Sequence, residues 1–476
     1  MPRIQFPIVA LLCLTIWNSY GQVLLGEKQI GKFETHDFGC DVDLSADGKV
    51  LAIGAFRSYD TAYHPGYVRI LEWRDDAWHQ LGKDIETTDE RDGFGYKVEL
   101  SADGKTLVAS AYDHPRLSVY RYQEGAWIQM GKDIYTRAVS QPVTDVAISD
   151  DGETIAYGVA HFPQGHIHRG VVRVFHWKEN KWIQVGEDIE GSIDEIAAGW
   201  CVALSADGNT LALTALGDSW EKIDGYASVY VYQNNQWTQK GNTLWGKGKD
   251  YVIGSYLSLS ADGNILAIGS VRPGEEHQSF VRVYSYSEET WDIIGQEISG
   301  YAKTSLSFNG RRITVARPSN ETCPVIILDL VENQWVQMGG TLYPEFMYEY
   351  PGGAIAISKD GTRLASASIY SGGLVAVYDI SSLEETSPDE ICVFQDTLES
   401  NIPIDIFPNP TSDLLFTSGV DLFKLAEMHA LQIYSMIGQE VNGQIVAENQ
   451  MDISHLPSGM YMIQLNDFVE KIIKAD

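Results

Sequence analysis

Short alternations of hydrophobic and polar residues run along most of the chain and predict β-strands. The segments VRILEW, SVYRYQ, VVRVFHW, SVYVYQ and VRVYSY each place apolar side chains at every second position, as half-buried strands do. A longer motif, LSADGKVLAIGA at 44–55, sets a polar Asp-Gly pair between two apolar runs, which is typical of two strands joined by a tight turn. Further copies of this motif begin at Leu100, Ile148, Leu204, Leu259, Leu306 and Ile357.

The spacing of these turns predicts the architecture. The residues at the Asp position lie 47 to 56 residues apart and are Asp47, Asp103, Asp151, Asp207, Asp262, Asn309 and Asp360. A period near fifty in strand-rich sequence is typical of a β-propeller with one blade per repeat. Each copy is expected to give four strands, which in the first are CDVDLS, KVLAIGA, YVRILEW and AWHQLGKDI. We therefore predict an all-β, seven-bladed propeller over residues 22–385.

The seventh repeat lacks its own fourth strand. The tryptophan of that strand recurs six times for seven turns, at Trp78, Trp127, Trp182, Trp237, Trp291 and Trp335. The last repeat stops after LVAVYDI at Ile380, whereas QVLLGEKQIG at 22–31 resembles the fourth strand of the first repeat. We predict that residues 22–31 supply the outer strand of blade seven, because closing the ring removes an exposed sheet edge.

The repeated Asp-Gly is interpreted as a corner. The Asp side chain is expected to accept a hydrogen bond from the backbone ahead, and Gly to take the positive φ of a tight hairpin. A calcium loop is the alternative, because Asp43-x-Ser45-x-Asp47-Gly48 resembles the start of one. Its glutamate at position 12 is absent, and the leading Asp becomes Ala203 in a later copy. We predict no metal and no other cofactor for the repeat system, with a single calcium-binding repeat as the open alternative.

Charge and the first residues bound the location and the partners. The formal charge of −31, with 65 acidic and 34 basic residues, repels phosphate backbones, so nucleic acid is not an expected partner. Arg3, an apolar run and small residues before Gln22 predict a signal peptide at 1–21, cleaved between Gly21 and Gln22. A buried N-terminal helix is the alternative. No second apolar run is long enough to predict a membrane span.

Candidate chemistry is sparse. The sequence has no GxSxG, HExxH, CxxC or phosphate-loop motif. Cys40 and Cys201 are expected to be thiols, and Cys323 and Cys392 could pair. Two polar clusters could in principle act as a metal site or as an acid and base, although solvated loops are the simpler interpretation. They are His161, His166 and His168 in one segment, and Asp89, Glu90 and Asp92 in another.

Loop lengths point to a binding face. The first-to-second and third-to-fourth connections are short, whereas the others are long, and alternate connections of an antiparallel blade share one end of the ring. Aromatics with scattered polar groups suit sugars or peptides. The predicted binding residues are Tyr59, Tyr63, His64, Tyr112, His161, Trp220, Tyr251, Tyr343 and Tyr350. We expect a non-catalytic module for an extracellular glycan or protein. The alternative is a polysaccharide hydrolase or lyase, which carboxylates converging on the central channel would favour.

Two stretches resemble known families. The Phe-Gly pairs at 38–39 and 94–95, each followed by a turn, are similar to the FG-GAP repeat of integrin-type propellers, and SADGKxL is similar to turns of WD40-like propellers. Those repeats imply a fold and no activity. The short turn here departs from the acidic calcium loop of many FG-GAP repeats.

Beyond a predicted linker at 386–403, residues 404–476 resemble the C-terminal sorting domain of the type IX (Por) secretion system of Bacteroidetes. The resemblance rests on the PNP motif, IYSMIGQEV, LPSGMYMIQL and a basic KIIK end; its marker residues are Pro408, Asn409, Pro410, Gly438, Pro457 and Gly459. It implies an Ig-like β-sandwich, the type IX machinery as partner, and export across the outer membrane to the cell surface or the medium. Such domains are commonly removed afterwards. An ordinary adhesive Ig-like module is the alternative.

Overall fold

The computed structural model describes residues 22–384 and the strands between 405 and 474. Within 22–384, the segments left out of the description are 33–35, 59–65, 88–91, 137–141, 161–169, 192–196, 217–223, 247–252, 272–278, 318–323, 343–353 and 370–372. The chain divides into two compact units, Met1–Ile391 and Cys392–Asp476, which are treated separately below. The described part contains no helix with the length and hydropathy needed to cross a membrane.

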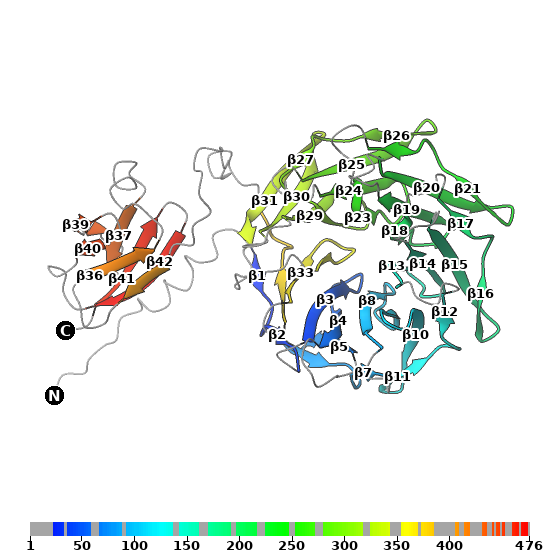
Figure 1. Cartoon of the computed structure of the whole chain (residues 1–476), viewed down its shortest axis with the longest axis horizontal. Helices are drawn as coiled ribbons and strands as arrows, with labels where there is room; N and C mark the ends of the chain where they lie inside the picture. The colour runs from blue at the N-terminus through cyan, green and yellow to red at the C-terminus, as the bar shows by residue number, and fades with distance from the viewer. Residues whose placement is uncertain are drawn as a thin grey trace, which may run out of the picture. The chain divides into compact units, whose positions relative to one another are not determined.

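The first unit is the predicted seven-bladed propeller (Figure 1). Each blade is an antiparallel sheet whose first strand lies nearest the centre of the ring. Blade 1 comprises β3 (His36–Leu44), β4 (Val50–Ser58), β5 (Tyr67–Arg74) and β6 (Ala77–Gln80), with β7 (Ile85–Glu86). Blade 2 comprises β8 (Phe94–Leu100), β9 (Thr106–Ala111), β10 (Arg116–Gln123) and β11 (Ala126–Gln129), with β12 (Ile134–Tyr135). Blade 3 comprises β13 (Asp145–Ile148), β14 (Thr154–Val159), β15 (Val171–Lys178) and β16 (Lys181–Gln184), with β17 (Ile189–Glu190).

The other blades repeat this plan. Blade 4 comprises β18 (Ala197–Leu204), β19 (Thr210–Leu216), β20 (Tyr226–Gln233) and β21 (Gln236–Gln239), with β22 (Leu244–Trp245). Blade 5 comprises β23 (Ile253–Leu259), β24 (Ile265–Ser270), β25 (Phe280–Ser287) and β26 (Thr290–Ile293), with β27 (Ile298–Ser299). Blade 6 comprises β28 (Lys303–Leu306), β29 (Arg312–Ala316), β30 (Val325–Val331) and β31 (Gln334–Leu342). Blade 7 comprises β32 (Ile355–Ile357), β33 (Arg363–Ser368) and β34 (Leu374–Asp379), completed by β1 (Val23–Leu24) and β2 (Gln29–Ile30).

Ring closure by the N-terminal segment is confirmed. Strand β1 pairs with β34 through Val23 and Asp379, and β2 pairs with the same strand through Gln29 and Val375. The indole Nε1 of Trp78 in blade 1 donates to the carbonyl of Leu25 at 3.0 Å. The segment therefore belongs to blade 7 and is also held by blade 1.

The predicted fourth strand is split in most blades. In blade 2 it becomes β11 and β12, which both pair with β10, on either side of Gly131 at φ 72°. The break at Gly131 makes room for the next blade, because a Cβ on Gly131 would lie 3.0 Å from the Trp177 ring. The Trp182 indole of that blade donates a hydrogen bond to Met130 O at 3.0 Å. The recurring tryptophan thus ties each of blades 1 to 6 to the blade before it.

The corner interpretation of the Asp-Gly turn is confirmed. The Asp47 carboxylate accepts from Lys49 N at 3.0 Å and from the Ser45 hydroxyl at 2.9 Å, while Gly48 takes φ 66°. The Ser45 hydroxyl oxygen accepts from Val50 N at 2.9 Å. Partial burial would raise the pKa of Asp47, but these hydrogen bonds outweigh it and the pKa is lowered.

The residue before each turn Asp also links the blades in a ring. Ala46 N donates to the carbonyl of Ala102 in the next blade at 2.9 Å, and the same link recurs from blade to blade. Asp360 N completes the circle by donating to Ala46 O at 3.0 Å. The recurring geometry of the turn therefore serves closure of the ring as well as reversal of the chain.

The hydrophobic core lies between neighbouring blades. One cluster joins Phe38, Leu51 and Tyr67 of blade 1 to Ala365 and Val375 of blade 7, all with exposed fractions of 1% or less. A similar cluster fills each of the other described junctions. Burial of this kind is the main stabilising term of the ring.

The second unit contains two four-stranded antiparallel sheets, as expected for a β-sandwich. One sheet has the order β35 (Asp405–Pro408), β36 (Leu414–Ser418), β40 (Gln450–Asp452) and β39 (Gln444–Ala447). The other has the order β38 (Glu440–Val441), β37 (Leu431–Ser435), β41 (Gly459–Leu465) and β42 (Phe468–Lys474). Pro408 ends β35 and Gly459 begins β41, whereas Asn409, Pro410, Gly438 and Pro457 lie outside the described residues.

Candidate functional site in the central channel

Charged side chains from the innermost strands meet around the axis of the ring. Alternation along β3 sends Val42 and Leu44 into the hydrophobic core, which leaves Asp41 and Asp43 on the other side of the strand. The Lys97 ammonium of blade 2 lies 4.0 Å from Asp41 of blade 1 and 3.7 Å from Asp145 of blade 3. Three blades therefore contribute to one polar cluster.

Each of these carboxylates also ties two blades together. Asp41 accepts from Val98 N at 2.9 Å, Asp43 from Leu100 N at 2.7 Å, and Asp145 from Val202 N at 2.9 Å. In every case the donor belongs to the innermost strand of the following blade. Hydrogen bonds to charged acceptors are the stronger ones, so this arrangement fixes the channel wall.

Burial dominates the electrostatics of the cluster. It raises the pKa of Asp145 to about 6, although the nearby Lys97 charge opposes the shift, and it raises the pKa of Asp41 in the same way. Burial would lower the pKa of Lys97, but the negative charges of Asp41 and Asp145 outweigh it, and the pKa lies well above its usual value. Lys97 is therefore a fixed positive charge between two carboxyl groups.

Asp43 and Glu99 form a second carboxyl pair nearer the short-turn end. Burial raises the pKa of Asp43 to about 7, and burial together with the Asp43 charge raises the pKa of Glu99 well above its usual value. The Glu99 Oε2 atom is buried and has no hydrogen-bond partner in the described structure. The charge of Asp43 disfavours ionisation of Glu99, so both groups release their protons at higher pH than exposed carboxyl groups do.

An ion pair spans the channel at the short-turn end. Lys359 of blade 7 binds the carboxylate of Asp150 in blade 3. These blades are not neighbours, so the pair can form only across the axis. Its partners are 29% and 25% exposed, which shows that solvent reaches this mouth.

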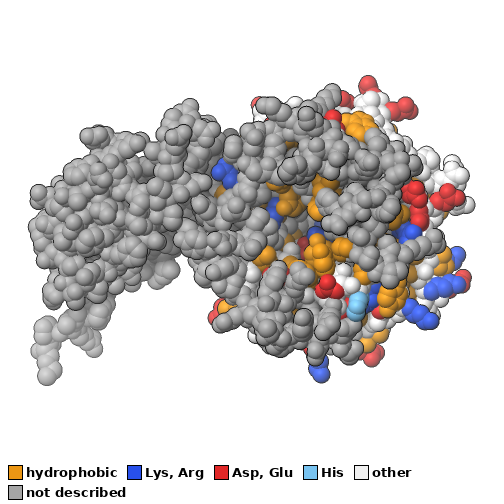
Figure 2. Space-filling model, in the orientation of Figure 1, with side chains coloured by type: hydrophobic (Ala, Val, Ile, Leu, Met, Phe, Trp, Pro, Cys, Tyr) orange, Lys and Arg blue, Asp and Glu red, His pale blue; other side chains and the backbone are white. Residues whose placement is uncertain are grey.

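Aromatic rings lie toward the long-loop end of blades 1 and 2. The rings of Phe56, Tyr96 and Tyr112 form a trio with centroid separations of 4.9 to 5.8 Å. Lys97 lies with its ammonium 5.8 Å from the Tyr96 centroid, which connects the trio to the charged cluster. On the face shown in Figure 2, hydrophobic side chains gather around the centre of the ring with acidic and basic side chains among them.

Two thiols border the cluster. Cys40 and Cys201 are free, and their sulfurs lie 3.3 Å from the carbonyl oxygens of Gly95 and Ser255. Burial raises the pKa of both thiols far above its usual value. They are therefore protonated donors and not nucleophiles at neutral pH.

One of the predicted binding residues lies in the described structure. Tyr112 is the member of the aromatic trio just named. The others, like Gly21, Cys323 and Cys392, lie outside the described residues; they are Tyr59, Tyr63, His64, His161, Trp220, Tyr251, Tyr343 and Tyr350. Of the acidic segment, Asp92 is described: it is fully buried and forms an ion pair with Arg116, which is a structural role. Among described residues, no group of three potential ligands is placed to hold a metal ion.

The channel cluster is not among the sites predicted from the sequence. A signal was present in the repeat itself: the positions four and six residues before the turn Asp carry Asp43 and Asp41 in the first copy, and Glu99 and Lys97 in the second. Charged residues at alternate positions of an otherwise apolar innermost strand mark the wall of a polar channel.

Comparisons with known proteins separate the two units. Residues 405–475 match the family described as the secretion system C-terminal sorting domain. The tail therefore interacts with the type IX secretion machinery and directs export through the outer membrane, to the cell surface or into the medium. No curated protein sequence matches the chain.

The propeller resembles solved structures in fold. The β-propeller domain of Cps50 (Swd1) from Myceliophteria thermophila aligns with a TM-score of 0.51 and 12% identity, over 74% of this chain and 100% of that chain. Hydrazine synthase of Kuenenia stuttgartiensis aligns with a TM-score of 0.49 and 14% identity, over 76% of this chain and 98% of that chain. At such identities the first likeness supports the propeller fold alone.

Proposed function

We propose that this exported propeller binds an extracellular glycan or protein at its long-loop end, where the central channel opens, without catalysing a reaction. The observation that carries the proposal is the aromatic trio of Phe56, Tyr96 and Tyr112 beside the cluster of Lys97 and its carboxylate partners. A few convergent polar groups next to aromatic rings are the usual composition of a recognition site.

A binding role also suits the state of the charged groups. Asp41 and Asp145 are held by backbone N–H groups and by Lys97, so they are oriented before any ligand arrives. Preorganised polar groups reduce the entropy lost on binding. The remaining long-loop aromatics, with Tyr63 and Trp220 as the two to test first, are proposed to complete the surface.

A glycan and protein array with the full chain would identify the ligand, and calorimetry would then test the site. Changing Tyr63 or Trp220 to Ala should weaken binding by about 1–3 kcal/mol each if they are central contacts. Ile293→Ala, on an exposed outer strand, is the matched control. Affinities for both aromatic variants equal to that of the control would remove the long-loop face from the proposal.

A polysaccharide hydrolase or lyase is the second candidate, and one observation favours it. The carboxyl groups of Asp43 and Glu99 converge in the channel with raised pKa values, which is how a general acid is kept protonated near neutral pH. A sugar-release assay on the same polysaccharides decides between the two. Sugar release by the native chain that Glu99→Gln abolishes, with binding retained, would establish an enzyme. No sugar release by the native chain would support the non-catalytic binding role.

The processing of the chain is part of the proposal. We propose cleavage before Gln22, origin in a bacteroidete, a propeller domain at 22–385 and a sorting domain from 404. A chain ending near Leu398 should fold, because the propeller has its own closed core, but should accumulate in the periplasm of the native host. Normal export of that truncated chain would contradict the boundary.

A further inference from the structure

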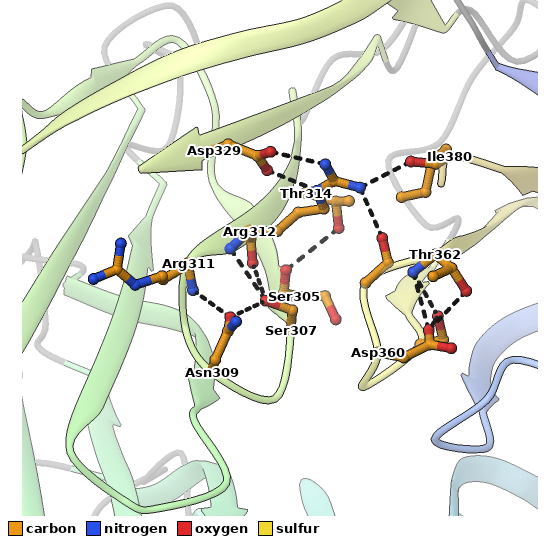
Figure 3. A network of polar contacts seen from close by, with 12 residues as sticks. Ser305, Ser307, Asn309, Arg311, Arg312, Thr314, Asp329, Asp360, Thr362 and Ile380 are labelled. Carbon is orange, nitrogen blue, oxygen red and sulfur yellow. Dashed lines mark hydrogen bonds and ion pairs between the residues drawn. The ribbon is translucent and has the colours of Figure 1, made fainter. Parts of the chain in front are cut away.

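A cleft opens at the short-turn end between blades 6 and 7. Its volume is about 730 Å³, within the range of small-molecule sites. It extends from Phe308 and Lys359, next to the channel, to Val331 and Ser381 at the ends of the third strands. Figure 3 shows the polar network along its wall, which Arg312 and the turn at Asp360 supply.

The cleft lies at the junction where blade 7 lacks an aromatic pair that blades 1 to 5 share. In blades 1 to 5 the third strand ends in an aromatic residue that packs on the hairpin tryptophan of the same blade, with ring centroids 5.1 to 5.3 Å apart. Ile380 occupies that position in blade 7, as its hydrogen bond from N to Thr362 O shows, and no hairpin tryptophan follows it. Ile380 and Leu383 are buried in the hydrophobic cluster of this junction, but they bring less side-chain volume than the two aromatic rings found in blades 1 to 5.

An exposed aromatic ring stands at the inner end of the cleft. Phe308 is 51% exposed. The equivalent residue before the turn is an alanine in four blades (Ala46, Ala102, Ala206 and Ala261), Asp150 in blade 3 and Lys359 in blade 7. Phe308 belongs to neither of the hydrophobic clusters described on the two sides of blade 6, and its exposed ring can stack against a bound molecule.

The polar groups beside Phe308 are partly unused. Arg312 is committed to Asp329 at 2.6 and 2.7 Å, and Lys359 to Asp150. The Arg311 side chain, by contrast, forms no hydrogen bond or ion pair within the described structure. It points away from Arg312, which extends in the other direction toward blade 7 (Figure 3). The Asn309 Oδ1 accepts two hydrogen bonds, from Ser307 at 3.1 Å and Arg311 N at 2.9 Å, which leaves the amide N–H₂ as a donor.

We infer that this cleft binds an acidic sugar unit, such as a uronate in an extracellular polysaccharide. The apolar face of the sugar would stack on Phe308, its carboxylate would meet the Arg311 guanidinium, and its hydroxyls would accept from the Asn309 amide. One spare guanidinium matches the single carboxylate of one uronate unit rather than a polyphosphate. The site lies at the opposite end of the ring from the proposed long-loop face and does not depend on it.

The test is titration calorimetry of the full chain with tetrasaccharides of galacturonate, mannuronate and hyaluronan, with cellotetraose as the neutral probe. At least one uronate should bind, and Phe308→Ala and Arg311→Gln should each weaken it about tenfold, which corresponds to 1.4 kcal/mol. Ile293→Ala, 53% exposed on an outer strand, is the control for surface truncation. Thermal melts establish that all three variants fold, and Tyr63→Ala should leave this affinity unchanged.

Three results would overturn the inference. The first is that no uronate binds, and the second is that Phe308→Ala or Arg311→Gln binds as tightly as the control. The third is equal affinity for cellotetraose, or displacement of the uronate by hexaglutamate at lower concentration, since either would remove the acidic saccharide as the class of ligand. Loss of binding in Tyr63→Ala would instead move the site to the long-loop face.

Discussion

Two junctions of the ring use the same arginine position and are packed differently. Between blades 7 and 1, Arg363 lies over the indole of Trp73, with its guanidinium carbon 5.6 Å from the ring centroid. Between blades 6 and 7, Arg312 occupies the same place but meets Ile380, whose carbonyl accepts its hydrogen bond at 2.8 Å. The first junction is filled by an aromatic ring, and the second opens as the cleft of about 730 Å³.

The turn glycines record the same difference. A Cβ on Gly48 would lie 2.6 Å from Arg363 Cδ, whereas a Cβ on Gly361 would lie 3.5 Å from Arg312 Cδ. Asp329 holds Arg312 against its own blade. The comparison shows that the turn and the arginine close the ring at both places, while the residue at the end of the third strand decides whether the space beside them is filled. Departures from the repeat therefore mark the places where a site can form.

The largest expected effect concerns β1 and β2, the N-terminal strands that complete blade 7 at its junction with blade 1. Deleting residues 22–31 removes two strand pairings, the Leu25 carbonyl bound by Trp78 and the Leu25 side chain packed on the core. With several hydrogen bonds lost at about 1 kcal/mol each and a sheet edge exposed, the free energy of unfolding should fall by several kcal/mol and the protein should aggregate. Thermal melts and light scattering measure both. A truncated chain that stays monomeric with an unchanged Tm would contradict the closure seen here.

The next effect tests the two arginines against each other. Arg312→Ala leaves the partly buried Asp329, 24% exposed, without its partner and removes bonds to blade 7, which should cost about 2–3 kcal/mol. Arg363→Ala removes one hydrogen bond and one ring contact, for about 1 kcal/mol. Denaturant unfolding of both variants gives the comparison. A larger loss for Arg363→Ala would mean that the ring of Trp73 depends on its cation more than the contacts indicate.

The sequence predicted the fold well because the repeat is periodic. Turn spacing gave the number of blades, and the missing seventh tryptophan led to the closing strand, which pairs with β34 as expected. The split of the fourth strand was not predicted, since the alternation of AWHQLGKDI does not reveal that Gly82, at φ 77°, turns the chain to admit the next tryptophan.

The candidate sites were harder to predict for a physical reason. The channel cluster depends on which blades face each other: Lys359 and Asp150 are 209 residues apart and meet only in a closed ring. The cleft depends on an absence, the aromatic missing at Ile380, and on Phe308, which replaces the Ala found at this position in four of the other blades. The repeat alone predicts a purely structural role for the short-turn end, whereas blades 6 and 7, which depart from the repeat, form the cleft beside Arg311.

The third effect concerns Asp43 in the channel, which feels the charge of Lys359 at the inner end of the cleft. That charge lowers the pKa of Asp43, but the larger effect of burial raises it to about 7. A carboxyl with a folded pKa of about 7 and an ordinary value of 3.8 binds more protons when folded, so its contribution to stability falls as the pH rises between about 4 and 7. Asp43→Asn should therefore gain stability relative to the native chain over that window, by on the order of 1–3 kcal/mol.

Unfolding by denaturant at pH 4 to 8 tests this, with Asp207→Asn as the matched control. Hydrogen bonds lower the pKa of Asp207 despite partial burial, so that carboxylate stabilises the fold above its ordinary pKa and the variant should lose stability there. The two variants should diverge in opposite directions as the pH rises. Parallel profiles would show that Asp43 is not held in its protonated form.

The smallest effect restores the common turn to the open junction. Asn309 replaces the Asp of the other turns, yet its Oδ1 accepts the same two hydrogen bonds, from the Ser307 hydroxyl at 3.1 Å and Arg311 N at 2.9 Å. Asn309→Asp should strengthen both hydrogen bonds, because a charged acceptor binds more tightly. The protein should gain about 0.5 kcal/mol of stability. By analogy with Asp47, whose pKa is lowered, the gain should be present at neutral pH and vanish as the pH falls below about 4. Asp47→Ala, expected to cost about 1 kcal/mol, calibrates the turn. A different result would be no change in stability for Asn309→Asp at pH 7 together with a loss of about 1 kcal/mol for Asp47→Ala. The turn hydrogen bonds beside the cleft would then be weaker than those at Asp47, and the two junctions would differ in their backbone as well as in their side chains.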